Sequence, residues 1–155
     1  EVIGTLPDGG RLVIEIKADA QILPPLKRIL GNGKLPPDRV TLIAFNAGTL
    51  DKARRQFDGC RTLWLCAHHR DMLGRPHLPK VGTLLRKAGA IGADGLNVQA
   101  CADLDSEFIA ACHEGEMRCW AWTVNDPAEA LRLRDAGIDA ITTDRPGLIR
   151  ETLFS

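Results

Sequence analysis

Glu15 and Lys17 are the first residues whose types and spacing suggest chemistry, because they place opposite charges at the end of an apolar stretch, residues 11–17 ("RLVIEIK"). Side chains along a β-strand alternate between its two faces, so Glu15 and Lys17 share a face with Val13. A carboxylate at a strand end can ligate a hard cation such as Mg²⁺ or Ca²⁺, and a nearby lysine can bind an anionic substrate group. A solvated strand end with an ion pair explains the same two residues, and this stretch alone leaves both interpretations open.

The elements that must position these residues alternate regularly along the chain. Apolar strand patterns and amphipathic helix patterns follow one another at about 25 residues per unit, which is typical of βα repetition and a parallel sheet. We expect strands at residues 11–17, 40–45, 61–67, 94–99, 118–124 and 139–144 and helices at 22–30, 49–57, 81–92, 105–115, 127–137 and 146–154. Residues 68–80 read as the one long irregular loop.

This pattern gives about six βα units in one domain, residues 1–155. A closed (β/α)₈ barrel needs eight units and typically about 250 residues, whereas an open doubly wound sheet can be built from six. Periodicity alone therefore leaves two α/β architectures open.

Composition restricts the function classes. The chain has 155 residues, with 20 basic and 20 acidic side chains, so its formal net charge is zero. This balance argues against a general nucleic-acid binder and against a polybasic membrane patch. No apolar run approaches the roughly 18 residues of a membrane span. The five cysteines form no CxxC pair, so we expect reduced, mostly buried thiols and a cytoplasmic protein.

A second block, residues 120–149 ("WAWTVNDPAEALRLRDAGIDAITTDRPGLI"), carries a family resemblance together with the first. "IEIK" resembles the third-strand motif of the glycerophosphodiester phosphodiesterases. "WTVND" followed by "GIDAITTDRP" resembles their seventh strand, seventh helix and eighth strand. The second block is the specific one, because this order of motifs extends over about 30 residues. The resemblance runs from about Pro7 to the end of the chain.

The resemblance implies a TIM (β/α)₈-barrel, of which this chain supplies six βα units, strands 3 to 8. Enzymes of this family use a divalent metal to hydrolyse deacylated phospholipids to an alcohol and glycerol 3-phosphate, a reaction of lipid and glycerol metabolism. By resemblance, Glu15 is a metal ligand and Lys17 contacts the substrate phosphate. Trp122 corresponds to the tryptophan beside the alcohol moiety, with a core aromatic as the alternative. Phe45 matches an aromatic after the fourth strand, where pocket lining and plain packing explain it equally well.

Several family motifs are absent from the sequence. The His-Arg-Gly motif and the His-Asp pair that carry the family's catalytic histidines do not occur, so the resemblance assigns no catalytic residue here. We expect His68 and His69 in a solvated loop, with the rim of the pocket as the alternative, and His113 on a helix surface. Asn97 is expected to make a structural turn contact, with an approach to the ligand as the alternative, and Asp144 is expected to cap the last helix.

The absent motifs belong to the family's first two βα units, which make eight when added to these six. We therefore expect a fragment or a chain completed from elsewhere, with those two units or another chain as the partner and a small phosphodiester as the substrate. A degenerate barrel that binds a phosphorylated ligand without turnover is the alternative function. An unrelated α/β barrel with a lysine Schiff base is a third, which the second block disfavours.

Overall fold

The computed structural model describes residues 2–33 and 35–154, which divide into two compact units. Unit 1 contains the described residues up to Trp64 together with Ala88–Asp94, and unit 2 contains Leu65–Lys87 and the described residues from Gly95 onward. Each unit is an α/β structure, and the two are described separately below.

Unit 1 contains the first three strands of the sheet. Its elements are η1 (Val2–Thr5), β1 (Leu12–Glu15), η2 (Ala20–Ile22), α1 (Leu23–Asn32), η3 (Pro37–Arg39), β2 (Val40–Ala44), α2 (Ala47–Gln56) and most of β3 (Arg61–Cys66). β1 pairs in parallel with β2, and β2 pairs in parallel with β3. Every residue of β2 is buried, which is typical of a central strand in a parallel sheet.

Local sequence explains where the helices of unit 1 begin. Pro24 and Pro25 occupy the first turn of α1, where a missing N–H costs nothing. The Asn46 side chain accepts a hydrogen bond from the Thr49 backbone N–H and so caps α2. The parallel order of β1 and β2 places the carboxyl ends of both strands at one edge of the sheet.

Unit 2 contains the remaining strands and helices. They are β4 (His69–Arg70), β5 (Pro76–His77), α3 (Val81–Ala90, whose last three residues belong to unit 1), β6 (Gly95–Gln99), α4 (Ser106–Glu114), β7 (Arg118–Trp122), α5 (Pro127–Asp135), β8 (Ala140–Ile141) and α6 (Pro146–Phe154). β7 pairs in parallel with both β6 and β8. Asp105 caps α4, and Asp126 caps α5 ahead of Pro127.

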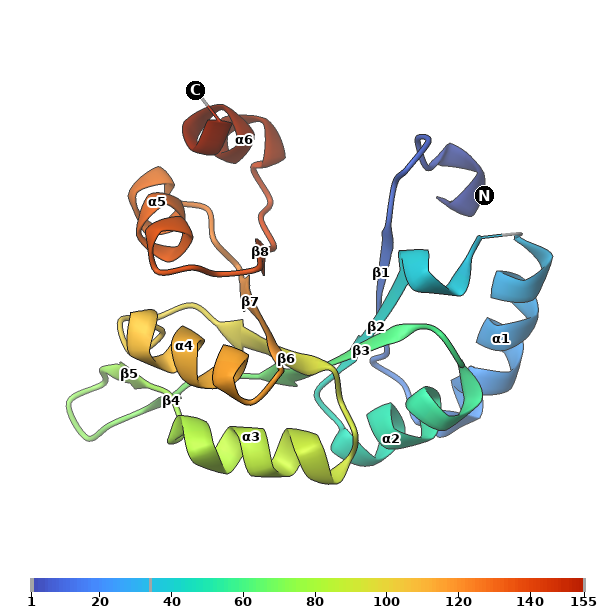
Figure 1. Ribbon diagram of the computed structural model, residues 1–155, viewed down its shortest axis with the longest axis horizontal. Helices are drawn as coiled ribbons and strands as arrows, with labels where there is room; N and C mark the ends of the chain where they lie inside the picture. Colours follow the sequence, from blue (N-terminus) through green and yellow to red (C-terminus); the bar gives the residue numbers. More distant parts are fainter. Residues whose placement is uncertain (1, 34, 155) are drawn as a thin grey trace. The chain divides into compact units, whose positions relative to one another are not determined.

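The strand order in the six-stranded sheet is β1-β2-β3-β6-β7-β8, so the sheet strands follow chain order and each is followed by a helix (Figure 1). This confirms six parallel strands in sequential order, and the described residues show no reversal of the kind that a doubly wound sheet requires. Every predicted strand is longer than the observed one, and the difference is largest for β1, which covers four residues, and β8, which covers two.

The prediction of an irregular loop over residues 68–80 is wrong. β4 and β5 pair antiparallel as a short ribbon, with His69 opposite His77 and Arg70 opposite Pro76. Figure 1 shows this ribbon as a green hairpin that projects from unit 2. Two-residue strands are too short to leave a period-2 pattern, and the glycine and prolines around them read as loop.

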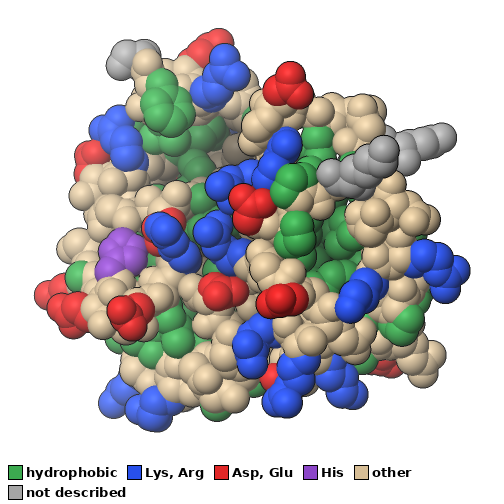
Figure 2. All heavy atoms as spheres, turned by 45° about the vertical axis from the view of Figure 1, so that its right-hand side comes forward, with side chains coloured by type: hydrophobic (Ala, Val, Ile, Leu, Met, Phe, Trp, Pro, Cys, Tyr) green, Lys and Arg blue, Asp and Glu red, His purple; other side chains and the backbone are tan. Residues whose placement is uncertain are grey.

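The surface charges and the burial of the cysteines match the expectations from the composition. On the face drawn in Figure 2, Lys and Arg side chains are interspersed with Asp and Glu side chains. All five cysteines are free, and all except Cys60 are buried, as expected. Among the described residues, none of the helices has the length and apolar character needed to cross a bilayer.

Candidate functional site

Glu15 is the last residue of β1, and Lys17 lies two residues beyond the end of the strand. The alternation predicted for this strand is confirmed, because Leu12 and Ile14 are half-buried while Val13 and Glu15 are exposed. Lys17 Nζ lies 3.5 Å from Glu15 Oε2, with 34% of the Glu15 side chain and 79% of the Lys17 side chain exposed. The two charges therefore form an accessible ion pair at the carboxyl end of a strand, where ligands of α/β folds bind.

A divalent cation is the group that the family resemblance implies for Glu15. Among residues 2–33 and 35–154, no group of three or more His, Cys, Asp or Glu side chains could hold a metal ion. The described residues therefore do not build a metal centre by themselves. Glu15 offers an exposed carboxylate of the type that Mg²⁺ and Ca²⁺ prefer, but it would be one ligand among several.

Phe45 lies directly after β2, in the same unit as Glu15. Its side chain is 49% exposed, and its backbone carbonyl accepts a hydrogen bond of 3.0 Å from Trp64 Nε1. A phenyl ring that is half-exposed has not been taken up by the core. Its position is therefore compatible with the pocket-lining interpretation.

Trp122 ends β7 in unit 2, as Glu15 ends β1 in unit 1. The Trp122 indole Nε1 donates a 3.1 Å hydrogen bond to the Asn97 carbonyl, and the side chain remains partly exposed. Trp120 lies on the same face of the strand and is also partly exposed, so it is less buried than a core residue. The indole of Trp122 is thus fixed by one polar contact while part of its ring stays accessible.

Asn97 and Gln99 on β6 extend this face of unit 2, and Gln99 was not singled out from the sequence. They lie opposite Trp120 and Trp122 in the parallel register. Asn97 is 1% exposed in mid-strand, and its Oδ1 has no hydrogen-bond partner among the described residues. Asn97 is therefore not the turn contact that was predicted. The signal was available, because polar residues at alternate positions of an apolar strand ("GLNVQ") repeat the pattern of Glu15 and Lys17.

Three of the four histidines lie in or directly before the ribbon, where His69 is opposite His77. The backbone N–H of His68 donates to Gln99 Oε1 at 3.3 Å, and its ring Nδ1 is buried without a partner among the described residues. His69 is exposed, as expected, but it lies in β4 and not in a loop, whereas His68 is only partly exposed. His113 lies on α4, where its Nε2 is 3.0 Å from Asp139 Oδ2.

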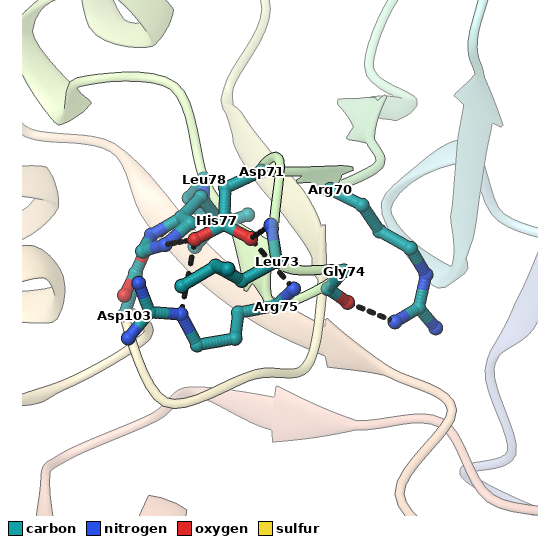
Figure 3. A network of polar contacts seen from close by, with 8 residues as sticks. All are labelled: Arg70, Asp71, Leu73, Gly74, Arg75, His77, Leu78 and Asp103. Atoms are coloured by element: carbon teal, nitrogen blue, oxygen red, sulfur yellow. Dashed lines mark hydrogen bonds and ion pairs between the residues drawn. The ribbon is translucent and has the colours of Figure 1, made fainter.

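His77 belongs to a polar network at the base of the ribbon (Figure 3). Its Nδ1 lies 3.0 Å from Asp103 Oδ2 and its Nε2 lies 3.4 Å from Asp71 Oδ2. Hydrogen bonds from the Leu78 backbone N–H and from the His77 side chain hold the pKa of Asp103 below its ordinary value. This network fixes the ribbon to the loop that precedes α4.

Asp144 is bonded to Asn125 rather than to the first turn of α6. Asn125 Nδ2 donates to Asp144 Oδ2 at 2.9 Å, and Asn125 Oδ1 accepts from the Asp144 backbone N–H at 2.8 Å. These bonds join the loops that follow β7 and β8. A hollow of about 600 Å³ opens at the carboxyl ends of β6 and β7; it is lined by residues 100–102 and 123–126, with Glu129 and Arg132.

The fold and these strand-end residues define an α/β protein built from sequential βα units. The sequence model of the Glycerophosphoryl diester phosphodiesterase family matches residues 13–148. The chain belongs to this family. A comparison with curated proteins gave no match.

Solved structures agree with this family. A Silicibacter pomeroyi protein described as a glycerophosphoryl diester phosphodiesterase is 23% identical with a TM-score of 0.76, over 92% of this chain and 50% of that one. An Oleispira antarctica phosphodiesterase in complex with the product sn-glycerol-3-phosphate is 18% identical with a TM-score of 0.76, over 94% and 56%. The Thermotoga maritima glycerophosphodiester phosphodiesterase is 19% identical with a TM-score of 0.69, over 97% and 61%. These similarities show a shared fold, and the chain spans about half the length of these proteins.

Proposed function

We propose that this chain is part of a metal-dependent phosphodiesterase that hydrolyses glycerophosphodiesters to an alcohol and glycerol 3-phosphate. The observation that carries the proposal is the family match over residues 13–148, within which Glu15 and Lys17 form an ion pair at the carboxyl end of β1. The activity would serve lipid and glycerol metabolism in the cytoplasm.

Lys17 and Glu15 would take complementary roles toward the substrate. The Lys17 ammonium, 79% exposed, is available to bind a phosphate oxygen as a point charge. Glu15 would supply one oxygen ligand to a Mg²⁺ or Ca²⁺ ion whose other ligands lie outside the described residues. When bound, such a cation offsets negative charge on the phosphate.

Phe45 and Trp122 would contact the less polar parts of the substrate. Both side chains keep exposed ring surface at strand ends, and each strand end is held by an indole hydrogen bond. The Trp122 ring, which its own hydrogen bond fixes, can pack against an alkyl or choline-like alcohol moiety with little further loss of side-chain entropy, whereas the bond at Phe45 is accepted by its backbone carbonyl and not by its ring.

Acid–base catalysis would come from residues outside this sequence, because the sequence lacks the two histidine motifs of the family. Cleavage of a phosphodiester requires a general acid for the leaving alkoxide and a general base opposite it, each typically worth about 10²–10⁴-fold. We propose that two further βα units, from the same protein or another chain, supply the catalytic histidines and complete an eight-unit barrel. This proposal is supported by the length of the chain, which covers only about half of each solved relative.

A binding module is the second candidate function. It would hold a phosphorylated ligand through Lys17 without turnover, and the absence of the His-Arg-Gly and His-Asp motifs from the sequence favours it. Binding without hydrolysis is what this chain would do if no other units complete it.

The test is to incubate the purified chain with glycerophosphocholine and Mg²⁺ or Ca²⁺ and to assay glycerol 3-phosphate. We expect no product from the chain alone, and metal-dependent product when a fragment carrying the two family units is added. Glu15→Ala in the same mixture should abolish that product. Product from the chain alone that disappears in Glu15→Ala would overturn the requirement for further units. If the chain binds glycerol 3-phosphate but no mixture yields product, the binding module is favoured.

A further inference from the structure

The tip of the β4–β5 ribbon presents two adjacent apolar side chains to solvent. Met72 is 103% exposed and Leu73 is 77% exposed, relative to an extended reference. Soluble proteins expose single apolar side chains routinely, but two neighbouring ones at the end of a projecting hairpin form an unusual arrangement.

Hydrogen bonds hold the backbone of this tip in place. The Asp71 Oδ1 accepts from the backbone N–H groups of Leu73 at 2.8 Å and Arg75 at 2.9 Å. Asp71 and Gly74 also close the turn through their backbones, where Gly74 has a φ of 77° that favours glycine. The network in Figure 3 therefore fixes the conformation that exposes Met72 and Leu73.

The base of the ribbon is fixed as firmly as its tip. The Asp103 carboxylate receives the Leu78 backbone N–H at 2.9 Å and lies 3.0 Å from His77 Nδ1. Both contacts lie within unit 2, so the ribbon projects as a rigid arm of that unit.

Basic side chains flank the apolar tip along the chain. Arg70 donates to the Gly74 carbonyl at 2.5 Å, Arg75 lies against Asp71, and Lys80 follows at the end of the ribbon. Asp71, the only acidic residue between His68 and Lys80, has both carboxylate oxygens engaged inside the turn. The ribbon is therefore basic, although the whole chain has a net charge of zero.

We propose that this ribbon docks on an anionic lipid surface, with Met72 and Leu73 inserted among the headgroups and acyl chains and Arg70 and Lys80 facing the lipid phosphates. Apolar side chains flanked by basic ones are the combination that interfacial membrane anchors use. The proposal goes beyond hydrolysis of a diester, since it concerns where the protein resides and not what it cleaves.

The charge of the ribbon also favours one kind of binding partner over another. In a second copy of this chain the same tip carries the same basic residues, so pairing tip to tip would bring like charges together. An anionic bilayer instead complements both the apolar and the basic side chains, and each Arg or Lys near such a surface strengthens binding about fivefold.

The test is sedimentation of the purified full chain with vesicles of phosphatidylcholine containing 30% phosphatidylserine, and with vesicles of phosphatidylcholine alone. We expect binding to the anionic vesicles, weaker binding to the neutral ones, and loss of binding as NaCl is raised to about 0.5 M. The double variant Met72→Ser/Leu73→Ser should bind anionic vesicles about tenfold less tightly.

The matched control is Ile29→Ser/Phe154→Ser, which removes two exposed apolar side chains from α1 and α6. It should bind as the unmodified chain does, and both variants should keep the unmodified melting temperature. Equal vesicle binding by the ribbon variant and the unmodified chain would overturn the proposal, as would no binding by either. A self-association of the chain that disappears in the ribbon variant would assign the tip to a contact between copies instead.

Discussion

The Lys17 ammonium lies 3.5 Å from the Glu15 carboxylate, so a cationic and an anionic group stand together at the carboxyl end of β1. Because both side chains are exposed, their attraction contributes little to folding, typically about 0.2–1 kcal/mol. A strand end that gains little stability from its charges can present them to a ligand.

Glu15→Gln is therefore expected to separate function from stability. In the active protein that contains this chain, the substitution should lower kcat/KM for glycerophosphocholine by about 10²-fold or more, because a neutral amide is a poor ligand for a hard cation. The free energy of unfolding should change by less than about 1 kcal/mol. Glu151→Gln, the same change on the exposed surface of α6, is the control and should leave both values unchanged. An active Glu15→Gln enzyme with unaltered metal dependence would contradict the role proposed for Glu15.

Trp122 is expected to act through its ring surface. Trp122→Ala should raise KM by about tenfold, since it removes both the aromatic contact and the bond to the Asn97 carbonyl. Trp122→Phe keeps most of the ring and should raise KM much less. Steady-state kinetics with two substrates that differ only in the alcohol would show whether the effect follows that moiety. A loss in Trp122→Phe as large as that in Trp122→Ala would assign the role to the indole N–H instead.

Asp103 is expected to control the rigidity of the ribbon. Asp103→Ala removes the acceptor for the Leu78 backbone N–H and the partner of the His77 ring, so the base of the ribbon should open more often. Trypsin should then cleave after Arg70 several-fold faster than in the unmodified chain. Asp135→Ala, at an exposed ion pair with Arg134, is the matched control and should not alter this rate. Unchanged cleavage in Asp103→Ala would show that other contacts hold the ribbon.

Asp139 gives a pH dependence of stability. Burial raises the pKa of Asp139, but hydrogen bonds from the Cys119 backbone N–H, Arg118 and His113 outweigh this and leave the pKa lowered. A lowered folded-state pKa means that the stabilisation is present above the unfolded pKa of about 3.9 and is lost as pH falls through the folded value. Urea unfolding should therefore show Asp139→Asn less stable by about 1–3 kcal/mol at pH 7, with the difference shrinking below about pH 4.

Asp135→Asn is the control for this titration, because the same change is made at a side chain that is 67% exposed. It should follow the unmodified chain at every pH within about 0.5 kcal/mol. A constant difference between Asp139→Asn and the unmodified chain from pH 7 to pH 3 would show that packing, and not ionisation, is responsible.

The sequence predicted the regular elements well because their patterns are long. Residues 40–45 and 49–57 carry an apolar run and an amphipathic stripe that match β2 and α2 closely. The caps at Asp105 and Asp126 were readable for the same reason, since a short polar residue precedes each helical pattern.

The contacts that the sequence did not predict depend on residues distant in the chain. Asp103 meets His77, and Asn125 meets Asp144, only after several elements have packed. Nothing near Asp144 in the sequence distinguishes a helix cap from a bond to another loop. The exposure of Met72 and Leu73 was equally unreadable, because an apolar pair next to a glycine suggests packing until the turn around Asp71 is known.

The order of the strands also bears on how the protein is made. Within the described residues, each strand of the main sheet lies beside the sheet strand that precedes or follows it along the chain. As the polypeptide leaves the ribosome, β1 and β2 can therefore pair before β7 has been synthesised, and each later strand finds its partner already formed. Strands that pair with their neighbours along the chain cost less loop-closure entropy than more distant partners would, which favours stepwise pairing from the N-terminal side. The order in which the strands are synthesised can therefore also be the order in which they pair.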